Sequence, residues 1–214
     1  MMMLLIFAVL AVVAYCAFKA YKIPEQPQKI NTPLAVSAFG VAIALCNEFI
    51  REELSLTTAS WQILAAKLIT FATIVYFLAF SLQKLIGFRL PELCHTVPFI
   101  YVAVKTAYTF INISALALIS DNVLIIAAYC VLMLFFINFG KFYNKLETEN
   151  SFRKVLATGF TVSILCVGQS VAYFLVNLFG SAKYLHVDAS IMFTLLLMGV
   201  FAALFTLSYF NKTE

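Results

Sequence analysis

The sequence has few charged residues and carries no catalytic or metal-binding signature. Only 11% of its 214 residues are charged, whereas a soluble domain carries about a quarter. The five cysteines show no CxxC spacing, and the two histidines fall in segments expected on opposite faces of a membrane. There is no glycine-rich phosphate loop and no HExxH, GxSxG or paired DxxD motif. These absences predict neither a metal site nor a cofactor, and they favour a protein that is not an enzyme.

Apolar residues dominate instead, since they make up 64% of the chain and the mean hydropathy is +0.99. In hydrocarbon every backbone donor and acceptor must be satisfied within the spanning element, which leaves helices or a closed barrel. The apolar runs are about 20 residues long and lack the alternation of membrane strands. The sequence therefore predicts an all-α, polytopic transmembrane helical bundle in contact with the lipid bilayer.

The predicted spans follow from the apolar runs, which are separated by short polar stretches. They cover approximately residues 1–18, 33–47, 60–80, 97–120, 123–140, 155–179 and 190–210. The connection between the fourth and fifth spans is predicted at Asp121 and Asn122, and the longest loop has about fourteen residues. Residues 1–214 are therefore expected to form a single transmembrane domain of about seven spans.

The distribution of lysine and arginine predicts the orientation of these spans. Loops one, three and five and the C-terminal tail carry ten basic residues, whereas the opposite side carries two. Short basic loops stay on the cytoplasmic side of a membrane. The N-terminus is thus predicted outside and the C-terminus in the cytoplasm of a multi-pass protein of the cell (plasma) membrane. Because the positive charge is spread over these loops, it does not indicate nucleic-acid binding.

The fourth predicted span has a polar face. An ionisable side chain at membrane depth costs about 2.5 to 3.5 kcal/mol on insertion scales and usually faces the interior of a bundle. Lys105 is such an ionisable residue within the fourth predicted span. Helical spacing places five side chains on one face: Tyr101, Lys105, Tyr108, Thr109 and Asn112.

A second polar stripe runs along the sixth predicted span and consists of Cys166, Gln169, Ser170, Tyr173 and Asn177. We expect the two stripes to line a common cavity between spans four and six, where the lysine of the fourth span meets an anionic solute. The predicted solute-binding residues are Lys105, Tyr101, Tyr108, Asn112, Gln169 and Tyr173. In the alternative interpretation these polar groups bond to one another and hold the bundle together.

Two further charges are expected to pair with each other. Lys67 lies about two turns into the third span, and Glu48 ends the second span on the same side. An ion pair would neutralise both charges. Alternatively, the Lys67 side chain is long enough to carry its ammonium group to the membrane–water interface. Lys105 has no equally obvious carboxylate partner among the apolar runs, because Glu92 and Asp121 lie near opposite ends of its span. Lys105 is therefore the predicted functional lysine.

Two functions from different classes remain open. The first is transport or permeation of a small solute or ion through the cavity between spans four and six. The second is that of a non-catalytic membrane subunit, which pairs its polar groups internally and binds another membrane protein or a second copy of itself. An intramembrane enzyme is disfavoured, since no histidine or carboxylate stands at mid-membrane to activate a nucleophile.

Overall fold

The computed structural model describes residues 31–51, 61–87, 90–113, 119–144, 146, 148–179 and 188–210. Within these ranges the chain forms six α-helices and one short 3-10 helix, and it contains no strand. The elements are α2 (Thr32–Arg51), α3 (Trp61–Ile86), η1 (Glu92–Thr96), α4 (Val97–Ile113), α5 (Ile119–Tyr143), α6 (Thr148–Leu178) and α7 (Ala189–Phe210). The prediction of an all-α bundle is confirmed.

Five of these helices are long and apolar enough to cross a membrane. The qualifying segments are Thr32–Arg51, Leu64–Ile86, Val123–Tyr143, Phe152–Leu178 and Ala189–Tyr209. Helix α4 has 17 residues and is about 25 Å long, slightly shorter than the hydrocarbon core of about 30 Å. The first predicted span, residues 1–18, lies outside the described residues. The helices are compatible with an integral membrane protein.

Two predicted connections differ in the structure because polar residues continue the helices. Helix α5 begins at Ile119, so Asp121 and Asn122 lie in its first turn rather than in a connection. Similarly, α5 extends to Tyr143 and α6 begins at Thr148, which leaves little of the predicted fourteen-residue loop.

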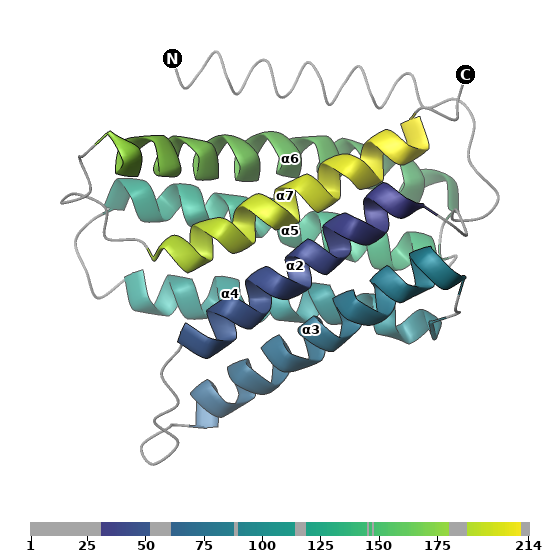
Figure 1. Cartoon of the computed structure of the whole chain (residues 1–214), viewed down its shortest axis with the longest axis horizontal. Helices are drawn as coiled ribbons and strands as arrows, with labels where there is room; N and C mark the ends of the chain where they lie inside the picture. Colours follow the sequence, from purple (N-terminus) through teal and green to yellow (C-terminus); the bar gives the residue numbers. More distant parts are fainter. Residues whose placement is uncertain are drawn as a thin grey trace.

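The six α-helices form a closed ring through their contacts, and Figure 1 shows them side-on, running in roughly the same direction across the view. Each helix packs against the next one in the chain, and α7 packs against α2. Because the connections are short, neighbouring helices are antiparallel. One end of the ring carries Lys84, Lys141 and Arg153, and we call it the basic end. A backbone hydrogen bond from Asn31 N to Lys84 O (3.1 Å) ties α2 to α3 there.

Phenylalanine rings fill the half of the ring nearest the basic end. They reach inward from α3, α5 and α7 and are fully buried. Ring centroids lie 5.5 Å apart for Phe77 and Phe201, 5.8 Å for Phe80 and Phe139, and 5.1 Å for Phe139 and Phe205. Edge-on and tilted contacts at these distances are favourable between aromatic rings. This half of the interior is therefore packed with side chains.

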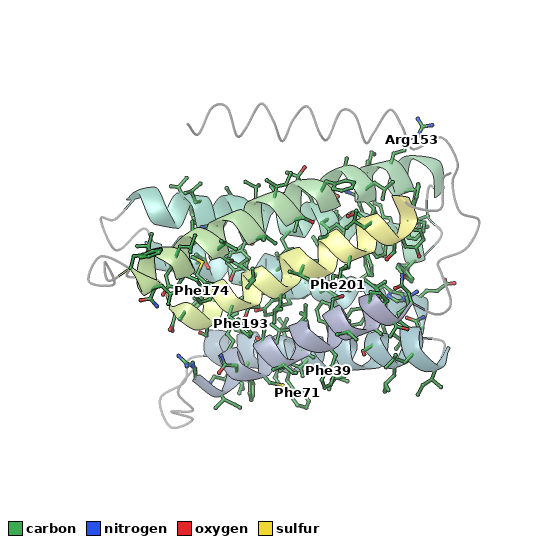
Figure 2. All side chains as sticks on the ribbon, turned by 45° about the horizontal axis from the view of Figure 1, so that its top comes forward. Phe39, Phe71, Arg153, Phe174, Phe193 and Phe201 are labelled. Atoms are coloured by element: carbon green, nitrogen blue, oxygen red, sulfur yellow. The ribbon has the colours of Figure 1, made fainter. Side chains whose placement is uncertain are left out.

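Large apolar side chains also cover the outside of the ring. Figure 2 shows Phe201 within the bundle, whereas Phe39 and Phe71 lie at its edge. Phe39 on α2 is 50% exposed and Phe71 on α3 is 55% exposed. A helix that is apolar on both its inner and its outer face is suited to hydrocarbon surroundings rather than to water.

Candidate functional site

Glu48 is a buried carboxylate that ends the buried face of α2. Leu34, Ala38, Val41 and Leu45 precede it at helical spacing, and each of them is completely buried. This spacing of four and three residues keeps one face of a helix against its neighbours. Glu48 continues that face and is 2% exposed. A carboxylate is thus held where apolar packing surrounds it.

Three side chains from two other helices bind the Glu48 carboxylate. The Lys105 Nζ atom on α4 lies 2.6 Å from Oε1 and forms an ion pair with it. The angles at this contact are not those of a hydrogen bond. The Tyr101 hydroxyl, also on α4, donates to Oε2 (3.3 Å), and the Thr194 hydroxyl on α7 donates to the same oxygen (2.9 Å). We call these four residues the Glu48 cluster. It joins α2, α4 and α7 inside the ring, in the half opposite the basic end.

Helix α4 places two of the predicted residues together and a third elsewhere. Tyr101 and Lys105 are one turn apart, and both are buried. The Thr109 hydroxyl donates to the Lys105 carbonyl (2.8 Å), a local bond of the kind that satisfies hydroxyl groups in apolar helices. Tyr108 is 47% exposed and lies outside the cluster. The Asn112 side chain is outside the described residues.

The prediction that Lys105 lacks a carboxylate partner is wrong. Its partner is Glu48, which comes from a helix more than 50 residues away in the chain. The expected Lys67–Glu48 pair stays a prediction, and the register of α2 and α3 places the two residues at one depth. Glu48 and Lys67 are each 17 residues from the Asn31–Lys84 hydrogen bond, so the common rise of about 1.5 Å per residue brings them to the same level.

The residues of the sixth predicted span lie apart from this cluster. Helices α4 and α6 each pack against α5 and are not principal neighbours of each other. Gln169 and Tyr173 on α6 are partly exposed, and Ser170 is buried with its hydroxyl donating to the Met192 carbonyl of α7 (2.9 Å). The two helices each pack mainly against α5 rather than against each other, and the cavity expected between spans four and six stays a prediction.

A second polar group lies near the basic end, among the phenylalanine rings. His95 of η1 is buried, its Nδ1 lies 2.8 Å from the Tyr76 hydroxyl, and its ring lies 4.3 Å from that of Tyr143. Lys84 Nζ lies over the Tyr143 and Phe80 rings at 5.4 and 5.5 Å. Burial, and then the nearby Lys84 charge, lower the pKa of His95 to about 4. This histidine is therefore neutral at physiological pH.

Sequence reasoning missed Thr194 and the surroundings of His95. Thr194 is one hydroxyl in a very apolar span, and nothing in its local pattern distinguishes it. Lys84 had a usable signal, since Phe77, Phe80 and Lys84 stand at the spacing of one helix face. We expected Lys84 in a loop, but it continues the buried face of α3 and is 1% exposed.

The Glu48 cluster can hold one carboxylate with a cation and two hydroxyl donors. It has no histidine or second carboxylate to act as a base, which a nucleophile would require. Among the described residues no group of three metal-ligating side chains comes together. Comparison of the chain with family models, curated proteins and solved structures finds no match.

Proposed function

We propose that the chain is a membrane carrier for small anionic solutes and that the Glu48 cluster is its binding site. The observation that carries the proposal is the ion pair between Lys105 and Glu48, enclosed by helices in the interior of the ring. Ionisable groups at membrane depth are rare and commonly mark the path of a solute. A buried pair also adds little stability compared with apolar side chains of similar size, so packing alone accounts poorly for it.

The packing inside the ring bears on how a solute would cross it. Because phenylalanine rings fill the other half of the interior, solute movement requires the helices to rearrange. This favours a carrier that alternates between conformations over a permanently open pore.

The distribution of basic residues supports a particular placement of the carrier. We place it in the cell (plasma) membrane with seven spans, the N-terminus outside and the basic end of the ring in the cytoplasm. In this orientation the Glu48 cluster lies in the outer half of the membrane, and solutes from outside reach it before they meet the phenylalanine rings.

Solute counterflow in proteoliposomes tests the proposal. Vesicles of purified protein, loaded in turn with unlabelled L-lactate, nitrate or phosphate, are expected to accumulate at least one of these anions in labelled form. Lys105→Met removes the cation of the site and is expected to abolish the accumulation. The matched control Lys154→Met changes an exposed lysine at the basic end and is expected to preserve it. Equal uptake by wild-type and protein-free vesicles for every anion contradicts the proposal.

One observation favours a second function, that of a non-catalytic subunit which binds another membrane protein. The charge of Lys105 is balanced within the chain, and the aromatic interior is tightly packed, as expected of a static scaffold. The counterflow experiment separates the two functions, because a scaffold moves none of the anions while remaining folded.

A further inference from the structure

The Glu48 cluster has the composition of a carboxylate-binding site that the protein's own side chain occupies. We propose that a small monocarboxylate takes the place of Glu48 there when Glu48 accepts a proton, so that substrate and proton cross the membrane together. This inference rests on the proposed carrier function, and it adds the class of substrate and the ion that drives its uptake.

The donors of the cluster are arranged around a carboxylate rather than around a single point. Lys105 faces one oxygen of Glu48, and the Tyr101 and Thr194 hydroxyls face the other. A cation at one oxygen and two hydroxyl donors at the other can bind any carboxylate of similar size. The Thr194 hydroxyl also lies 3.0 Å from the Ser190 carbonyl, so it has another acceptor during the exchange. A substrate carboxylate therefore finds its three donors already in place.

Charge balance makes the exchange depend on a proton. In the structure the negative charge of Glu48 balances that of Lys105, and Glu48 is the one buried carboxylate among the described residues. Protonation of Glu48 removes that balance, and an uncompensated charge at this depth is strongly unfavourable. A monovalent anion restores the original net charge, whereas a dicarboxylate adds one negative charge too many.

The titratable and charged groups around Glu48 come from α4, α7 and α3. Tyr101 and Lys105 on α4 and Thr194 on α7 contact its carboxylate, and the partly exposed Lys67 on α3 lies at the same depth. No covalent bond changes. The proton comes from water on one side, rests on a Glu48 oxygen, and leaves to water on the other side with the substrate.

Proton-coupled uptake of L-lactate by the full-length protein in vesicles tests the inference. A pH-sensitive dye inside the vesicles and labelled lactate outside are expected to report about one proton per lactate, and an acidic outside is expected to raise the initial uptake rate about tenfold. In Glu48→Gln the pH gradient is expected to give no such increase. The matched control Glu92→Gln alters an exposed carboxylate at the basic end and is expected to retain it.

The outcomes separate this inference from the carrier function. Lactate counterflow without proton movement overturns the coupling but leaves a carrier. Transport of nitrate or phosphate with no transport of lactate overturns the substrate class. Absence of transport for every anion overturns both proposals. The ratio of protons to lactate is measured on the wild-type protein after subtraction of protein-free vesicles, because undissociated lactic acid also crosses lipid, so the test stands even where Glu48→Gln fails to fold.

Discussion

At the scale of single residues, the ion pair between Glu48 and Lys105 accounts for how two charges are tolerated inside an apolar ring. Each charge alone would be strongly unfavourable there, and together they are neutral and bound by two hydroxyl groups. The local sequence cannot reveal such a pair, because its members come from different helices. Lys105 was identified from the cost of burying its charge, but its partner was not.

Breaking the pair is expected to destabilise the protein more than removing it. Glu48→Gln and Lys105→Met should each lower the free energy of unfolding by about 3 to 5 kcal/mol, because each leaves one buried charge unbalanced. The double variant should recover most of this loss, since neither charge remains. Unfolding of the four proteins in mild detergent measures the effect. Losses that simply add in the double variant would show that the two residues are not coupled.

His95 is expected to make stability depend on pH. Its folded-state pKa of about 4 lies below the usual value of 6.5, so the unfolded state binds more protons between these values. Stability is therefore complete above pH 6.5 and falls as the pH decreases toward 4, by on the order of 3 kcal/mol. His95→Phe keeps an aromatic ring in place and should remove this part of the pH dependence. Melting temperatures across this range test it, with His186→Gln as the control.

At the scale of helices, the positions of most elements could be predicted because apolar runs of membrane length have few alternatives. The ends of α5 and α6 could not, since polar residues such as Asn122 and Glu149 extend a helix without any apolar signal. The sequence also could not predict which helices pack against each other. A polar stripe indicates that a helix has a buried face, but it does not say which other helix covers that face, as Gln169 illustrates.

Close packing of α6 against α7 depends on glycine. A Cβ atom at Gly199 would lie 2.9 Å from Cys166 Cβ and 3.2 Å from the Val167 backbone nitrogen. Gly199→Ala is therefore expected to push the helices apart and to cost about 1 to 3 kcal/mol. A Cβ atom at Gly168 meets nothing within 4 Å, so Gly168→Ala is the matched control. Equal melting temperatures for the two variants would show that α6 and α7 do not pack this closely.

At the scale of the whole molecule, the ring separates a polar half from an aromatic half. The Glu48 cluster occupies one, and the rings around Phe139 and Phe201 occupy the other. Composition was sufficient to predict a helical membrane protein, because few other folds tolerate so apolar a chain. The division of the interior was not predictable, since it depends on which faces of distant helices meet.

The orientation in the membrane has its own test. In a variant without the five native cysteines, Asp188→Cys is expected to react with an impermeant thiol reagent added outside intact cells. Lys154→Cys should react only after the membrane is permeabilised, because basic loops face the cytoplasm. Both positions are exposed at opposite ends of the ring. Labelling of both from the same side would contradict the predicted spans.

The most direct test of the central claim is whether a carboxylate binds at the Glu48 cluster. A ligand that binds only the folded state raises its unfolding free energy by RT ln(1 + [L]/Kd). The purified protein should therefore melt at a higher temperature as L-lactate is added, and by more at acidic pH, because the proposed exchange consumes a proton. The increase should be absent in Lys105→Met. A melting temperature that lactate leaves unchanged at every pH would contradict the account.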